Sequence, residues 1–81
     1  MNKTRRAQLQ KVRIALEDQK TELEELSVAE LEAWENMPES IQASDRGEAM
    51  EAAAELMAEA ADDIAHTLDT IYNAHFIADS G

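Results

Sequence analysis

One short segment interrupts an otherwise continuous series of helix-forming residues. Ala, Glu, Leu, Gln, Lys, Arg and Met fill most positions, and the chain has only two Gly and one Pro. The residues that break or cap helices gather in the sequence NMPESIQAS of residues 36–44. Pro38 removes a backbone donor and disfavours helical geometry at Met37, whereas Ser44 is a good N-cap for a following helix. The pattern therefore predicts helix, turn and helix, with Ile41 packed between the helix ends.

Both helical segments carry apolar residues at the three- and four-residue spacing that places them on one face. On the first segment this stripe consists of Leu9, Val12, Leu16, Leu23, Leu26 and Ala33, extended by Trp34 and Met37. On the second it consists of Met50, Ala53, Met57, Ala60, Ile64, Leu68 and Ile71, flanked by Ala54, Ala61 and His75. Folding back near residue 42 pairs Leu26 with Met57, Leu23 with Ala61 and Leu16 with Leu68. The expected fold is an all-α, antiparallel, coiled-coil-like hairpin.

This hairpin is expected to be a single domain over residues 1–81. Its expected parts are a helix at about residues 3–36, a turn at about 37–44 and a second helix at about 45–77.

Charge is divided unevenly along the chain, whose formal net charge is −11. Residues 1–16 carry five basic residues and no acid, whereas all 18 acidic residues follow, with only Lys20 and Arg46 among them. In an antiparallel hairpin the basic start is expected to face Asp62, Asp63, Asp69 and Asp79. Exposed ion pairs contribute only about 0.2–1 kcal/mol each, so this complementarity favours an orientation more than it adds stability.

A second apolar line on the first helix indicates that the hairpin has a partner. Ala7, Ile14, Thr21 and Val28 recur at intervals of seven, and Leu31 lies between this line and the main stripe. One stripe per helix is a thin core for 81 residues, and no cysteine is present to stabilise it. We expect a homodimer in the form of a four-helix bundle, with Ile14, Val28 and Leu31 at the dimer or second interface. The alternative is a monomeric hairpin that docks this line on a different protein.

The sequence offers little for catalysis. It has no recognisable nucleophile motif and no Gly-rich phosphate loop. Asp63-x-x-His66, with Glu59 one turn earlier, resembles the ligand spacing of di-metal helical bundles. Glu59 and His66, however, point away from the apolar stripe, so a solvated acidic face explains them better. We therefore expect no enzyme activity, no cofactor and no metal site.

An acidic stripe follows the outer face of the second helix. Its members, spaced by three or four residues, are Glu48, Glu51, Glu55, Glu59, Asp62, His66 and Asp69, of which all but His66 are acidic. Each step rises about 4.5–6 Å, comparable to the phosphate spacing along a nucleic-acid strand. The stripe is therefore a candidate partner-binding surface for a basic protein, and its spacing suggests the hypothesis of a DNA mimic. The alternative is a solvated face that serves only solubility.

We expect no direct binding to nucleic acid, because the acidic surface repels it. No apolar run approaches the ~18 residues of a membrane span. No apolar stretch follows the basic N-terminus, as one does in a signal peptide. We expect no membrane association and a cytoplasmic location.

The turn carries a resemblance to known proteins. NMPESIQ at residues 36–42, followed by SDRGE at residues 44–48, resembles the turn of small acidic two-helix proteins of phage and prophage genomes. That group has no established activity, but the resemblance implies a phage accessory role in the host cytoplasm. Such proteins often act by occupying a host enzyme or defence complex. The resulting hypothesis is an inhibitor that binds a host nucleic-acid-handling or defence protein; the alternative is a scaffolding homodimeric coiled coil.

Overall fold

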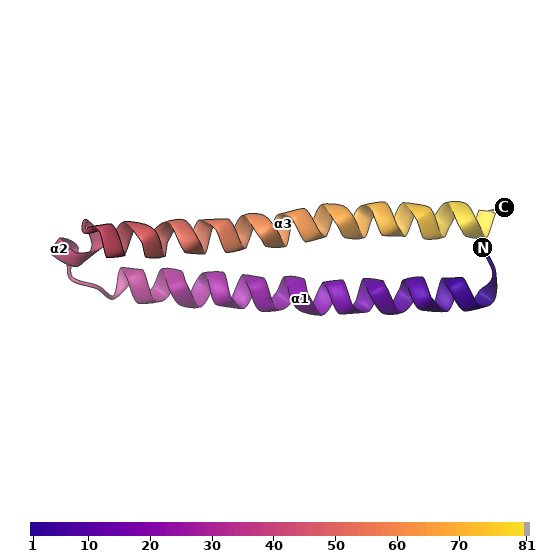
Figure 1. Ribbon diagram of the computed structural model, residues 1–81, viewed down its shortest axis with the longest axis horizontal. Coiled ribbons are helices and arrows are strands. Elements are labelled where there is room, and N and C mark those ends of the chain that lie inside the picture. Colours follow the sequence, from indigo (N-terminus) through magenta and orange to yellow (C-terminus); the bar gives the residue numbers. More distant parts are fainter. Residues whose placement is uncertain (81) are drawn as a thin grey trace.

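The computed structural model describes residues 1–80, and the side chains of residues 1–78. Its elements are α1 (Lys3–Glu35), α2 (Glu39–Gln42) and α3 (Asp45–Ser80). The two long helices lie side by side and antiparallel, α2 forms the bend, and both termini lie at the opposite end (Figure 1). The Cα atoms span 60 × 15 × 13 Å. The predicted all-α hairpin is thereby confirmed, in the form of a narrow rod.

Local capping determines where α1 begins and ends. Asn2 is its N-cap, and Asn2 Oδ1 accepts a hydrogen bond from the Arg5 amide at 2.8 Å. Asn36 is its C-cap, immediately before the Met37–Pro38 pair that disfavours further helix. The end of α1 therefore agrees with the sequence prediction.

The bend contains more structure than the sequence predicted, because residues 39–42 form the one-turn helix α2. Gln42 Nε2 donates to the Trp34 carbonyl at 2.9 Å and to the Glu35 carbonyl at 3.3 Å. These bonds satisfy carbonyl groups that the last turn of α1 leaves without helical partners. Ile41 is 40% exposed, so the prediction that it packs between the helix ends is wrong. Gln42, rather than an apolar side chain, ties the bend to α1.

Gly47 allows α3 to begin close against α2. The residue is buried, and a Cβ atom placed on it would overlap the carbonyl oxygens of Ile41 and Gln42. The expected N-cap is present, since the Gly47 amide donates to Ser44 Oγ at 3.3 Å. Gly47 is thus required by the close approach of backbone atoms, whereas the sequence suggested only that it is tolerated there.

The contact surface of α1 is rotated from the predicted stripe by about one heptad position. Its half-buried residues form two rows with a spacing of seven. One row is Leu9, Leu16, Leu23, Glu30 and Met37, and the other is Arg6, Arg13, Lys20, Ser27 and Trp34. Val12, Leu26 and Ala33 are exposed, which contradicts their predicted place in the core. The leucine row was therefore predicted correctly, but the row that accompanies it was not.

A polar row can face α3 because its members contribute more than charge. Long Lys and Arg side chains cover apolar surface with their methylene groups while the charged ends reach water. Ser27 Oγ donates a 2.7 Å hydrogen bond to the Ala54 carbonyl, which joins the two helices directly. These two effects allow Arg13, Lys20 and Ser27 to occupy positions that a hydropathy pattern assigns to apolar residues.

The contact surface of α3 agrees better with the prediction. Met50, Met57, Ile64, Leu68 and Ile71 are half-buried, whereas Ala53 is exposed. Ala54 and Ala61, predicted to flank the stripe, are each only 2% exposed and are the buried apolar residues of the described chain. Small side chains at these positions allow the helices to approach closely, but they bury little area. The hairpin seam, meaning the contact between α1 and α3, is therefore thin.

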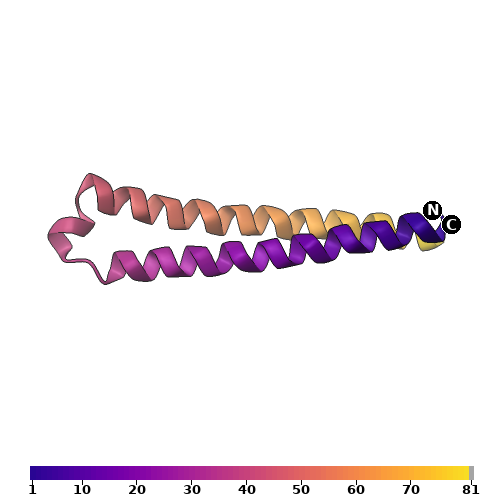
Figure 2. The same cartoon turned by 60° about the horizontal axis from the view of Figure 1, so that its bottom comes forward.

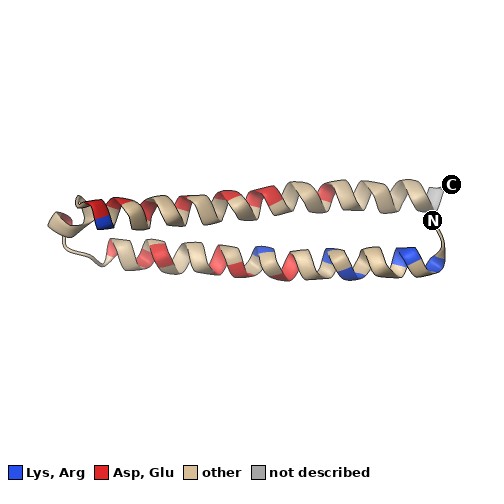
Figure 3. Cartoon of the chain, in the orientation of Figure 1, with Lys and Arg blue, Asp and Glu red and all other residues tan. Residues whose placement is uncertain are grey.

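In the turned view of Figure 2, α1 passes in front of α3 toward the end that holds the termini. Basic residues of α1 gather at this end, and acidic residues predominate elsewhere on both helices, with Lys20 and Arg46 among them (Figure 3). Asp62 lines a groove with Glu24, so it does not face the basic start as the sequence suggested. Lys20 instead pairs with Glu24 on its own helix at 3.0 Å. The side chain of Asp79 lies outside the described residues.

Candidate interaction site

Two shallow grooves between the helices identify one broad side of the rod. The first is lined by Gln10, Arg13, Tyr72, His75 and Phe76. The second is lined by Glu24, Ser27, Val28, Ala58, Ala61 and Asp62. Residues seven apart lie in the same row along a helix that packs in a coiled-coil manner. The grooves therefore show which rows of α1 and α3 border each other on this side.

The carboxylates of the predicted stripe gather on this side. Asp62 and Phe76 line the grooves, and the spacing of seven places Glu48, Glu55 and Asp69 in the same row of α3. Glu51, which is half-buried, lies in the neighbouring row with Ala58 and Tyr72. Glu59 is exposed on the outermost surface of α3, at the edge of this side.

Rows from both helices give this side a strong negative charge. It consists of four rows, each made of every seventh residue. On α1 the rows run from Lys3 to Leu31 and from Ala7 to Glu35, and on α3 they run from Glu48 to Phe76 and from Glu51 to Tyr72. They hold eight acidic residues and one basic residue, Lys3. We call this surface the acidic side. The structure thus brings together five of the six predicted partner-binding residues and leaves Glu59 at the edge of the acidic side. It adds carboxylates of α1 that the sequence prediction omitted, namely Glu17, Glu24 and Glu35.

The three residues of the second apolar line border the same acidic side. Val28 lines one of its grooves, Ile14 lies two heptads before Val28, and Leu31 lies one heptad after Glu24. Their exposed fractions are 47% for Ile14, 55% for Val28 and 38% for Leu31. The two predicted sets of site residues, apolar and acidic, therefore share one surface.

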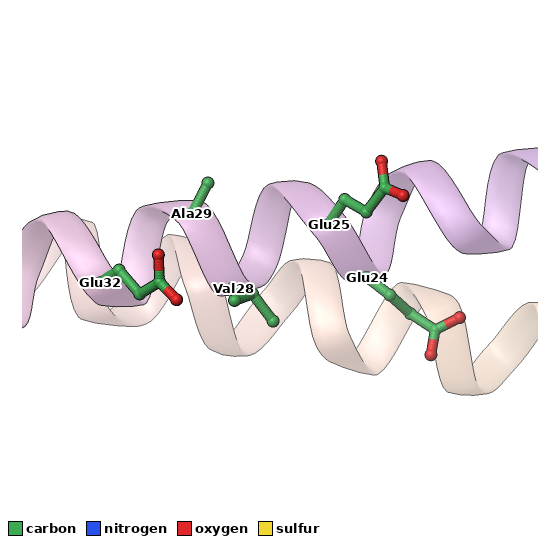
Figure 4. Close-up of a pocket in the computed structure, with 5 residues that line it drawn as sticks. All are labelled: Glu24, Glu25, Val28, Ala29 and Glu32. Atoms are coloured by element: carbon green, nitrogen blue, oxygen red, sulfur yellow. The ribbon is translucent and has the colours of Figure 1, made fainter.

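Figure 4 shows the immediate surroundings of Val28. A shallow hollow on α1 is lined by Val28 and Ala29 together with Glu24, Glu25 and Glu32. An apolar contact made there is consequently surrounded by carboxylates on the same helix. Such a surface fits a partner that combines an apolar anchor with basic residues.

The opposite side has a different composition, which sequence reasoning missed. It also consists of four rows, each made of every seventh residue. On α1 the rows run from Arg5 to Ala33 and from Gln8 to the C-cap Asn36, and on α3 they run from Arg46 to Ala74 and from Ala49 to Ile77. Alanines are frequent in these rows, and the large exposed apolar residues are Val12, Leu26, Leu56 and Ile77. The charged residues are Arg5, Glu22, Arg46 and Asp63, whose formal charges cancel. We call this surface the alanine-rich side.

Among the residues whose side chains are described, His66 and the acids near it in sequence form no ligand cluster. His66 and Glu59 are both exposed on the outer surface of α3. In the part of the chain that the structure describes, no group of three or more His, Cys, Asp or Glu side chains is arranged to hold a metal ion. Within that same part, no helix combines the length and the apolar character needed to cross a bilayer.

Comparison with known proteins adds no relative. No protein-family model, no curated protein and no solved structure matches the chain.

Proposed function

We propose that this hairpin is a non-catalytic protein-interaction module that works as a homodimer and binds a basic partner protein through its acidic side. The observation that carries the proposal is the gathering of eight carboxylates around Ile14, Val28 and Leu31 on one side. Apolar anchors supply affinity, and the surrounding carboxylates steer and select a positively charged partner.

The specific form of this proposal is a phage-type inhibitor of a host nucleic-acid-handling or defence protein. Two features support it. From Glu48 to Asp62 the carboxylates of α3 recur every three or four residues, at steps of about 4.5–6 Å, which supports a fit to a groove that normally accepts a phosphate backbone. The turn at residues 36–48 resembles that of small acidic phage proteins. A partner that binds nucleic acid would then be blocked by competition.

The test is capture of basic proteins from a bacterial lysate with the immobilised hairpin, followed by competition with duplex DNA. The test variant combines Glu55→Lys with Asp62→Lys on the acidic side. The control combines Asp18→Lys with Glu39→Lys, two exposed acids outside both broad sides. Both variants change the net charge equally, so any difference between them reports the position of the charge.

We expect the acidic-side variant to lose capture and the control to retain it. DNA should displace the captured protein if the carboxylates imitate phosphates. Equal retention by both variants at low salt would overturn the acidic side as the binding surface. Circular dichroism should show unchanged helicity in both variants, because the four side chains are exposed.

The competing function is a scaffolding coiled coil whose acidic side serves only solubility. The thin seam and the neutral alanine-rich side support it, since both features favour assembly rather than recognition of a charged partner. In that case the wild-type protein would assemble but capture no basic protein, and both charge-reversal variants would behave like it.

A further inference from the structure

The hairpin exposes more surface than a folded chain of its mass usually does. Its accessible area is 5968 Å², whereas a compact monomer of 9.0 kDa exposes about 4,900 Å². Most of the difference reflects the narrow rod, in which the long helices α1 and α3 pack only against each other along their length. A second rod placed against either broad side would remove area of the missing size.

The two broad sides differ in how well they can accept a second copy. On the acidic side, two copies would bring together surfaces that each hold eight carboxylates against one basic residue. On the alanine-rich side the charges cancel, so the approach of a second copy adds no comparable repulsion.

The alanine-rich side also has the residues that helix packing needs. Leu26 is 56% exposed and Leu56 is 64% exposed, so each leaves a large apolar surface in water. Exposed alanines such as Ala53 lie in the adjacent row and allow helices to approach closely. Large and small side chains are thus available to interdigitate across a contact between two copies.

We propose that the alanine-rich side is the contact with a second copy of the chain, and that the two hairpins lie antiparallel in a four-helix bundle. This inference rests on the homodimer in the proposed function and identifies its interface. The outline of the rod, 60 by 15 Å, encloses about 900 Å², close to the ~800 Å² per partner of a stable interface. One broad side is therefore large enough for a stable dimer.

Charge along the rod selects the antiparallel orientation. At the end that holds the termini, residues 1–16 carry a charge of +5 and residues 68–78 of α3 a charge of −1, so this end of the rod is positive. Residues 17–67 have a net charge of −14. Antiparallel rods place the positive end of each copy beside the acidic part of the other, whereas parallel rods place acidic parts together.

The first test compares matched lysine substitutions at exposed apolar residues on the two sides. Leu26→Lys combined with Leu56→Lys changes the alanine-rich side, and Ile14→Lys combined with Val28→Lys changes the acidic side. Sedimentation equilibrium should show a wild-type dimer of about twice 9.0 kDa. The alanine-rich-side variant should dimerise about 100-fold more weakly, because it buries unpaired charge in the contact. The acidic-side variant should remain dimeric.

If the acidic-side variant lost dimerisation and the alanine-rich-side variant kept it, the inference would be overturned. The interface would then be assigned to the line of Ile14, Val28 and Leu31. A wild-type protein that is monomeric at millimolar concentration would overturn the dimer itself. Partner capture is measured separately, so either failure is distinguishable from failure of the acidic side as a binding surface.

A second test does not depend on the folding of the lysine variants. The chain has no cysteine, so Gln19→Cys introduces a single thiol in the row of Val12 and Leu26, at the middle of α1. In antiparallel rods this position lies near the two-fold axis, where two copies can approach within the ~7 Å between Cα atoms that a disulfide needs. The control is Thr21→Cys, which lies on the acidic side.

Mild oxidation should convert most of Gln19→Cys, and little of Thr21→Cys, into a covalent dimer on non-reducing electrophoresis. A Gln19→Cys protein that sediments as a dimer but forms no covalent link would overturn the antiparallel orientation. Preferential linking of Thr21→Cys would place the contact on the acidic side.

Discussion

The acidic side and the alanine-rich side are built from the same two helices, yet they differ in almost every physical property. The rows of the acidic side hold eight carboxylates and one lysine, with Ile14, Val28 and Leu31 among them. The rows of the alanine-rich side hold two acidic and two basic residues, with small side chains between exposed Leu26 and Leu56. The first is suited to a charged partner of another kind, and the second is suited to a copy of itself.

Under the two proposals above, this difference would give a two-helix rod two separate interfaces. The seam occupies one face of each helix and leaves two flanks, which the antiparallel arrangement joins into two broad sides. A change in the seam should therefore affect both sides together, whereas a change on one side should affect only that side. The predictions below use this distinction.

The largest effect is expected from Ala61→Glu in the seam. Ala61 is 2% exposed, so a carboxylate there would be buried without a partner and should cost more than about 3 kcal/mol. Circular dichroism should show loss of helicity, and dimerisation and partner capture should be lost together. The control, Ala52→Glu, makes the same change at an exposed position of α3 and should remain folded. A folded Ala61→Glu protein would show that the seam does not support the two sides.

A smaller loss of stability, which affects the whole hairpin, is expected from Gly47→Ala at the bend. The added Cβ would overlap the carbonyl oxygens of Ile41 and Gln42, and forced repacking of this kind costs about 1–3 kcal/mol. Thermal unfolding should show a lower Tm, with dimerisation and capture retained below it. The control is Ala49→Gly at an exposed position of the same helix, which should lower the free energy of unfolding by only about 0.5–1 kcal/mol. A higher Tm for Gly47→Ala would contradict the close contact between α2 and α3.

Ionic strength should separate the two sides without a mutation. Raising salt from about 50 to 500 mM should weaken partner capture about tenfold or more, because screening removes attraction between exposed charges. The same change should leave dimerisation equal or stronger, since each chain carries −11 and screening reduces their mutual repulsion. Surface plasmon resonance and sedimentation equilibrium measure the two responses. Parallel weakening of both would mean that one surface serves both contacts.

The smallest effect is expected from Ser27→Ala, which removes the hydrogen bond to the Ala54 carbonyl. This bond is part-buried and 2.7 Å long, so its loss should cost about 0.5–1.5 kcal/mol. Chemical denaturation measures the change. Thr21→Ala is the control, because the Thr21 hydroxyl donates to the Glu17 carbonyl within α1 and does not join the helices. Equal costs for the two variants would show that the Ser27 bond adds nothing to the seam.

The sequence predicted the course of the backbone well because the signals involved are local. Pro38 ends the first helix, Ser44 caps the second, and the spacing of Leu9, Leu16 and Leu23 identifies a row that faces α3. Such signals act over a few residues and need no knowledge of the partner helix. The one-turn helix at residues 39–42 was missed because its stabilising contact, from Gln42 to the end of α1, joins residues seven and eight apart.

Local spacing also predicted part of the acidic side. The spacing of Glu48, Glu55 and Asp62 places them on one face of any helix, so their grouping follows from the sequence. The sequence did not predict that this face of α3 lies beside Val28 of α1, because that arrangement depends on which flank of α1 borders α3.

By itself, then, the amino-acid sequence determined two long helices, a single bend and their antiparallel return, since propensity, capping and the proline act locally. The tertiary structure alone decided which row accompanies the leucines in the seam. Hydropathy favours Val12 and Leu26 as seam residues, but the helices meet through Arg13, Lys20 and Ser27. The methylene groups of Arg13 and Lys20 can cover apolar surface, and the Ser27 hydroxyl can bond to α3, only after the chain folds back. That rotation leaves Val12 and Leu26 on the outside and creates the alanine-rich side.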